Sequence, residues 1–227
     1  MIHYHRDLIQ GSDEWLQARC GLLTASEMKL ILSPKTLKLA KNEKASAHLY
    51  ELAAQRISQY VEPRYIGDDM LRGQADEIEA RTLYAKHFAA VEQVGFVTRD
   101  DWGFTLGASP DGLVGDDGMI ECKSRRAKYQ VETIASQAVP EEYGLQIQTA
   151  LLVTGRKFCD FISYCGGLPM VVLRVHPDSA VQNAILAAAT AFERDMAEVL
   201  SLYRMGCEGL ARTVPTERRV EMEMFIQ

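Results

Sequence analysis

The sequence has few cysteines, and none of them belongs to a recognisable metal-binding or redox pair. Its five cysteines are scattered along 227 residues without a Cys-x-x-Cys. An odd number of dispersed thiols argues against a disulfide framework or a zinc site and indicates reduced thiols. His3-x-His5 is more typical of a solvated terminus than of a metal site.

Long hydrophobic runs and a secretory signal are also missing. No apolar stretch approaches the roughly 18 residues of a membrane span, and residues 1–7 contain no hydrophobic signal segment. A content of 47% hydrophobic and 25% charged residues is ordinary for a globular protein. We therefore expect a cytoplasmic protein without a membrane partner. Residues 1–227 should form a single domain, with N-terminal helices over 1–92, a core over about 93–176, and a C-terminal helix and tail over 177–227.

An overall positive charge is absent, which argues mildly against nucleic-acid binding. The formal net charge is −6, but the distribution of charge matters more than its sum. Residues 28–48 carry five lysines against one glutamate, and residues 123–128 place four cations in six positions. Both segments fit either contact with DNA or solvated helix faces.

Hydrophobic periodicity and turn residues predict a mixed α/β (α+β) fold, with one central mixed β-sheet flanked by helices. A capping box from Thr24 to Glu27 should open the first helix. We expect helices over about 24–32, 43–60, 68–91, 140–153 and 179–205. Short strands are expected over 93–98, 103–107, 112–114, 119–123, 157–164 and 170–175.

The most informative motif is Ser-Pro-Asp-Gly at 109–112, followed by Glu-Cys-Lys at 121–123. Residues i and i+2 of a strand share a face, so Glu121 and Lys123 should project together. A hairpin turn over 115–118 would bring Asp111 to the same point. Two carboxylates suit Mg²⁺, which can polarise a phosphodiester, while a lysine can orient or deprotonate the attacking water. The alternative is an ordinary turn followed by a strand with exposed charges.

Side chains from two helices can join this group. Glu77 follows Gly73 by one helical turn and can add a third carboxylate, directly or through water. Gln146 can orient water or contact phosphate, and Tyr143 lies one turn before it on the same face. The alternatives are a solvated Glu77, on a helix rich in acids, and an exposed Gln146.

A second group can bind a phosphate. Arg19 and Ser26 flank the start of a helix, where anions bind readily, and Ser109 lies two residues before Asp111. A terminal 5′-phosphate would suit them. Alternatively, Arg19 pairs with an acid and Ser26 only caps the helix.

The sequence contains, in order, Trp-x3-Arg-x-Gly-x2-Thr-Ala-Ser, Gly-x3-Glu, Ser-Pro-Asp-Gly, Glu-x-Lys and Tyr-x2-Gln-x-Gln. Over residues 15–154 this order resembles the family of phage lambda exonuclease and the YqaJ-type viral recombinases, within the PD-(D/E)xK nuclease superfamily. The lysine-rich segment 35–44 departs from lambda exonuclease. The resemblance implies a restriction-endonuclease-like fold for the nuclease domain.

The resemblance also implies a role for each matching residue. The Mg²⁺ ligands would be Asp111, Glu121 and the backbone carbonyl of Cys122, and Mn²⁺ should substitute, with one or two ions bound. Glu77 would assist as an acidic ligand, and Lys123 would position or activate the water beside Gln146. The 5′-phosphate would be held by Arg19, Ser26 and Ser109. The wedge that separates base pairs would fall near Met70 or Leu71, with Tyr143 a further DNA contact, although the sequence favours core packing for at least one of Met70 and Leu71.

The implied activity is 5′→3′ exonuclease digestion of one strand of duplex DNA, which releases mononucleotides and leaves a 3′ overhang for recombination by strand annealing. The implied assembly is a homotrimeric ring around DNA, with a phage single-strand annealing protein as partner, in a bacterial host cell that carries a phage or prophage. Two alternatives stay open. One is a structure-specific or restriction-like endonuclease of the same superfamily, and the other is a non-catalytic DNA-binding protein of this fold.

Overall fold

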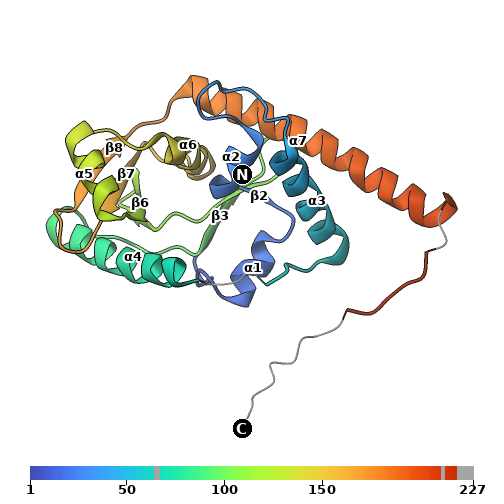
Figure 1. The fold of residues 1–227 in the computed structure, drawn as a ribbon, viewed down its shortest axis with the longest axis horizontal. Helices are drawn as coiled ribbons and strands as arrows, with labels where there is room; N and C mark the ends of the chain where they lie inside the picture. Colours follow the sequence, from blue (N-terminus) through green and yellow to red (C-terminus); the bar gives the residue numbers. More distant parts are fainter. Residues whose placement is uncertain (64–66, 211–212, 219–227) are drawn as a thin grey trace, which may run out of the picture.

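The computed structural model describes residues 1–63, 67–210 and 213–218, which form two small β-sheets surrounded by helices (Figure 1). The last helix is the longest and extends beyond the rest of the domain. The helices are α1 (Asp13–Arg19), α2 (Met28–Ile31), α3 (Glu43–Ser58), α4 (Asp68–His87), α5 (Ala127–Ser136), α6 (Glu141–Thr154) and α7 (Ser179–Met205), with short turns η1 (Ala25–Glu27) and η2 (Gly206–Leu210).

The first sheet has four strands in the order β1-β3-β4-β2. The strands are β1 (Ile2–His5), β2 (Leu23–Thr24), β3 (Phe96–Arg99) and β4 (Leu106–Ala108). β3 pairs antiparallel with β1 and β4, whereas β2 pairs parallel with β4. The N-terminal 92 residues therefore contribute two strands to this sheet, and are not only helical as the sequence indicated.

The second sheet has the order β5-β6-β7-β8. Its strands are β5 (Gly112–Val114), β6 (Gly118–Ser124), β7 (Phe158–Tyr164) and β8 (Val171–Val175). β6 and β7 are parallel, and both outer pairs are antiparallel. The chain leaves the first sheet after Ala108 and enters the second at Gly112, so the Ser-Pro-Asp segment lies at the junction. Proline cannot donate to a β-ladder, which is consistent with a break in pairing there.

Alternation along β6 and β7 divides the second sheet into two faces. Ile120, Cys122 and Ile162 pack in the same cluster as Tyr84 from α4. Met119 and Phe161 belong to the main core, together with α6. α4 and α6 thus lie on opposite faces of this sheet.

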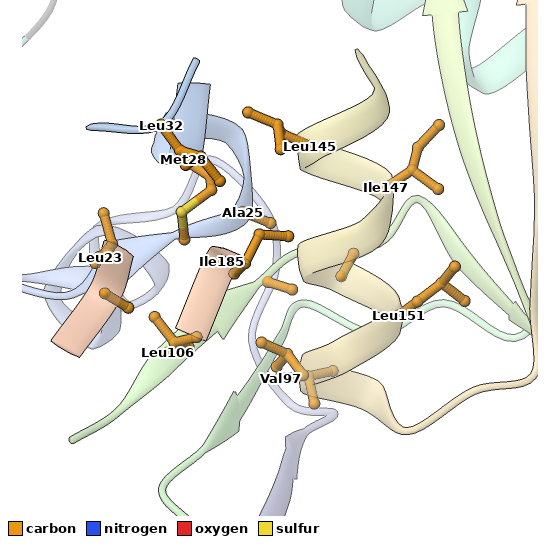
Figure 2. Close-up of a cluster of buried hydrophobic side chains, with 14 of the residues drawn as sticks. Leu23, Ala25, Met28, Leu32, Val97, Leu106, Leu145, Ile147, Leu151 and Ile185 are labelled. Carbon is orange, nitrogen blue, oxygen red and sulfur yellow. The ribbon is translucent and has the colours of Figure 1, made fainter. Parts of the chain in front are cut away.

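Helix α6 lies at the centre of the fold, and residues on opposite sides of it are buried. Figure 2 shows Leu145, Ile147 and Leu151 along α6, with Ile185 of α7 and Leu106 of β4 nearby. Gly155 ends the helix in a left-handed conformation with φ 67°, which glycine adopts without steric cost. Rigid packing of α6 fixes the position of the polar residues that it carries toward β6.

Several helix ends follow from local sequence. Asn42 accepts a hydrogen bond from the backbone N–H of Ala45 at the start of α3, and Asp178 caps α7 in the same way. The capping box expected at Thr24 is wrong, because the Thr24 hydroxyl donates to the Glu27 carboxylate and caps no backbone N–H. A short 3₁₀ turn forms there instead.

The mixed α+β fold predicted from the sequence is confirmed, but the single central sheet is two separate sheets. Helices α3, α4, α6 and α7 and the strands β3 to β8 lie close to their expected positions. Five elements were not foreseen, namely β1, α1, β2, α5 and the short turn η2. Among the described residues, no helix combines the length and apolar character that a bilayer span requires.

Candidate active site

Strand β6 places a buried acid beside a lysine. Glu121 and Lys123 point to the same face, and Lys123 Nζ lies 2.5 Å from Glu121 Oε1. The side chain of Glu121 is 2% exposed, whereas that of Lys123 is 25% exposed. From α6, Gln146 Nε2 also donates to Glu121 Oε1, at 2.5 Å. The structure therefore brings together three of the residues that the sequence selected.

Asp111 joins them across the β5–β6 hairpin. Its Oδ2 accepts a hydrogen bond from the backbone N–H of Cys122 at 2.5 Å, which anchors the buried carboxylate to β6. Desolvation raises the pKa of Asp111 well above its usual value, and the negative charges of Glu121 and Glu77 add to this effect. Burial and the neighbouring negative charges both disfavour the ionised Asp111 carboxylate, and a bound cation would favour it.

Glu77 approaches the same point from α4. Burial raises the pKa of Glu77, Arg81 opposes this, and the charge of Glu121 raises it further. A glycine inside a helix suggests close packing, but a Cβ at Gly73 would meet nothing within 4 Å, so no close neighbour requires glycine there. Glu77 is electrostatically part of the acidic cluster.

The oxygen atoms of this site fit a hard divalent cation if they supply only a few of its ligands and water supplies the others. Carboxylate and carbonyl oxygens are the ligands that Mg²⁺ prefers, and it commonly retains several waters. Within the described part of the chain, no three His, Cys, Asp or Glu side chains form a ready-made cation site. Asp111, Glu121 and the Cys122 carbonyl are therefore the candidate ligands, and Glu77 fits the outer position, through water.

Lys123 is held as a cation in this environment. Burial lowers the pKa of Lys123, but the neighbouring Glu121 and Asp111 carboxylates outweigh it, so the pKa is raised above its usual value. Its ring neighbour is Tyr143, whose centroid lies 5.4 Å from Nζ. An ammonium group donates hydrogen bonds, which suits orientation of a water or a phosphate oxygen.

A second cluster of donors forms around Arg19, the last residue of α1. Its Nη1 donates to Ser109 Oγ and its Nη2 to Thr24 Oγ1, both at 3.2 Å. Ser26 Oγ lies 3.3 Å from Thr24 Oγ1. The guanidinium stacks 4.3 Å from the Trp15 ring, which restricts its orientation. Arg19, Ser26 and Ser109 are therefore neighbours, as the phosphate-site prediction requires.

One cavity of about 810 Å³ connects the two clusters. Its lining includes Arg19 and Thr24 from the hydroxyl-rich cluster and Glu77, Arg81 and Asp111 from the acidic one. Ligand pockets commonly have this size and combine apolar walls with a few polar groups. The arrangement can hold a phosphate at one end while a second phosphate lies near the acids.

Two expectations about the surroundings are wrong. Met70 and Leu71 are both more than half exposed, so neither has the core role that the sequence favoured for at least one of them. Met70 lines the cavity, whereas Leu71 is not among its lining residues. In the basic segment after β6, Arg125 is buried and pairs with Glu142, and Arg126 pairs with Asp69. With Lys123 paired to Glu121, three of the four cations at 123–128 are thus engaged with protein acids.

Tyr143 is a structural neighbour of the site. Its hydroxyl accepts a hydrogen bond from Arg125 Nη1 at 2.9 Å, and its ring stacks on Phe161. Gln146 lies one turn later on α6 and reaches Glu121. The predicted shared face of Tyr143 and Gln146 therefore points toward β6, while a contact of Tyr143 with DNA stays a prediction.

Sequence reasoning missed Thr24 and Arg81. Thr24 bonds both Arg19 and Glu27, and its place in Thr-Ala-Ser beside Ser26 was the available signal. Arg81 lies four residues after Glu77, a spacing at which side chains on a helix meet. That spacing from a candidate catalytic acid could have identified it.

Known proteins resemble the chain in sequence and in fold. A family model described as a YqaJ-like viral recombinase domain matches residues 14–157. The alkaline exonuclease LHK-Exo from Laribacter hongkongensis, also solved in complex with dAMP, is 32% identical, with a TM-score of 0.78 over 88% of this chain and 100% of its own. A phage-related exonuclease from Haemophilus somnus 129PT shares the fold, with 12% identity and a TM-score of 0.57 over 80% and 96% of the two chains. No curated protein matches.

Proposed function

Because the chain belongs to the YqaJ-like viral recombinase family, we propose that it is a Mg²⁺-dependent exonuclease acting on duplex DNA. It would degrade one strand from a 5′-phosphorylated end and release mononucleotides. The family and the 32% identical alkaline exonuclease support a nuclease. The proposal goes beyond a nuclease in specifying the strand polarity, the duplex substrate and the cation.

The observation that carries the proposal is the convergence of Asp111, Glu121 and Lys123 on one side of β6. A cation at the two carboxylates would polarise the scissile phosphate and lower the pKa of a bound water. Lys123 would donate to the water or to a phosphate oxygen, and Gln146 would keep Glu121 oriented. These roles match a hydrolytic phosphodiester reaction, in which positioning and electrostatics dominate.

The cluster around Arg19 supports an end-dependent reaction. Arginine and hydroxyl groups bind a phosphate through charge-assisted hydrogen bonds. The shared cavity would let the 5′-phosphate rest on Arg19, which also donates to Ser109, while the next phosphodiester lies near Asp111. A free end would then be needed to fill the pocket before cleavage.

The proposed setting follows from the family. A 3′ overhang made by this reaction is the substrate for recombination by strand annealing, so we expect a phage annealing protein as partner, in the cytoplasm of a bacterium that carries the phage or prophage. We also expect a homotrimeric ring. A ring needs basic charge only along its channel, which is compatible with a net charge of −6.

The proposal is tested by digesting linear duplexes that carry a label at either the 5′ or the 3′ end, alongside a covalently closed plasmid. Early release of labelled mononucleotide from the 5′ end, with an intact plasmid, is the expected result in Mg²⁺. Cutting of the closed plasmid would indicate an endonuclease. Binding without hydrolysis of any substrate would indicate a non-catalytic protein of this fold.

Replacement of Arg19 by alanine should remove the preference for phosphorylated ends. Each charge-assisted hydrogen bond to phosphate is worth about 1.5–3 kcal/mol, so we expect the preference for 5′-phosphate over 5′-hydroxyl to fall at least about tenfold. Initial rates on matched duplexes that differ only in the 5′ group measure this ratio. Arg194→Ala, on the exposed face of α7, is the control. An unchanged ratio in Arg19→Ala would remove Arg19 from the phosphate pocket.

A further inference from the structure

Arg81 is a positively charged residue inside the acidic cluster. It lies on α4 one turn after Glu77, and its side chain is only 18% exposed. Nη1 donates to Glu77 Oε1 at 3.0 Å and to the main-chain carbonyl of Asp111 at 3.2 Å. Arg81 also lines the cavity that Glu77 and Asp111 share. A single nitrogen therefore links the helix to the turn that carries a candidate cation ligand.

The carbonyl contact distinguishes this pair from an ordinary helix ion pair. Exposed pairs four residues apart contribute little and leave the acid free to turn into solvent. Here the same Nη1 that binds Glu77 also donates to the Asp111 carbonyl, which lies outside α4, and a planar guanidinium has donors in fixed directions. The Glu77 carboxylate is consequently held at the acidic cluster, although the same helix carries exposed acids such as Glu79.

Charge and geometry predict opposite effects of Arg81 on a nearby cation. As a positive charge, Arg81 repels a cation, so its removal alone would tighten cation binding. As the group that orients Glu77, it keeps an acceptor ready for the waters of the cation, so its removal would weaken binding. Partners that orient the ligands of a metal typically affect its affinity by 10- to 100-fold.

We propose that Arg81 is a positioning residue that ties Glu77 to the Asp111 turn and so prepares the outer side of the cation site. The inference rests on the proposed function, because it assumes that Asp111 and Glu121 hold a divalent cation. It also requires that the loss of Glu77 orientation weakens cation binding more than the removal of the Arg81 positive charge strengthens it.

Calorimetric titration of the full chain with Mg²⁺ and Mn²⁺, without DNA, tests the proposal. Arg81→Gln should bind either ion about tenfold more weakly than the unmodified protein. Arg81→Lys keeps the charge but replaces the planar pair of donors, so it should also bind more weakly, and it provides the measurement if Arg81→Gln does not fold. Arg72→Gln, on the same helix with a 46% exposed side chain, should leave the affinity unchanged.

A double-mutant cycle with Glu77→Gln separates positioning from a general structural effect. If Arg81 acts through Glu77, Arg81→Gln should cause no further loss once Glu77 is replaced. Unchanged or tighter binding in Arg81→Gln would overturn the proposal, as would a full tenfold loss in the Glu77→Gln background. If the unmodified protein binds neither ion, the cation-dependent function fails together with this inference. Normal binding by both the unmodified protein and the Arg81 variants overturns this inference alone.

Discussion

Replacement of Lys123 by alanine is expected to slow DNA cleavage by about 10²–10³-fold while duplex ends are still bound. This is the usual cost of losing one preorganised donor to a charged transition state. The ammonium lies 2.5 Å from Glu121 on the strand that carries the candidate cation ligands. Few other interactions depend on it, so the fold should survive.

Single-turnover cleavage and end binding in Ca²⁺ measure the two effects of Lys123→Ala separately. Because the raised pKa of Lys123 makes it an ammonium group, Lys123→Arg should retain more activity than Lys123→Ala. Lys86→Ala, which removes an exposed lysine of α4 outside the basic segment, is the control and should cleave normally. Cleavage by Lys123→Ala at the rate of the unmodified protein would contradict the assigned role.

Replacement of Asp111 by asparagine should abolish cleavage and at the same time stabilise the protein without a cation. The raised pKa of Asp111 means that the folded state holds the proton of this carboxyl more tightly than the unfolded state does. Stability is therefore lost as pH rises through the folded pKa. Asparagine has no such charge, and its side-chain oxygen can still accept from the Cys122 N–H.

Thermal unfolding across pH measures this trade-off between stability and activity. We expect Asp111→Asn to raise the free energy of unfolding by about 1 kcal/mol or more. For a chain of this size, each kcal/mol raises Tm by about 2–4 °C. The stabilisation should grow from acidic to alkaline pH. The exposed Asp116→Asn should show neither effect. Equal stability of Asp111→Asn and the unmodified protein at alkaline pH would mean that the Asp111 charge is already compensated.

Much of the site was predictable because it depends on short-range geometry. The i, i+2 rule was enough to pair Glu121 with Lys123, and the Gly-rich turn before β6 was enough to bring Asp111 back. The helical spacing of Tyr143 and Gln146 gave their common face. In each case the repeat of the local secondary structure, two residues in a strand or about 3.6 in a helix, decides which way a side chain points.

Features that depend on long-range packing were not predictable. Whether Met70 is buried depends on what covers α4, and whether Arg125 is free depends on Glu142 from α6. Strand β1 has only four residues, which are too few for a clear alternation, and its partner β3 lies more than 90 positions away. The division into two sheets has the same origin, since it is set by pairings between distant segments.

The Ser-Pro-Asp segment between the two sheets also has a consequence for the size of the product. If Ser109 holds the end phosphate and Asp111 holds the cation, their Cα atoms are two residues apart and at most about 7 Å from one another. That separation belongs to the main chain, so changes of side-chain rotamer cannot lengthen it. Each cut would then fall at a constant step from the end, and an insertion between Ser109 and Asp111 would alter the length of the released fragment.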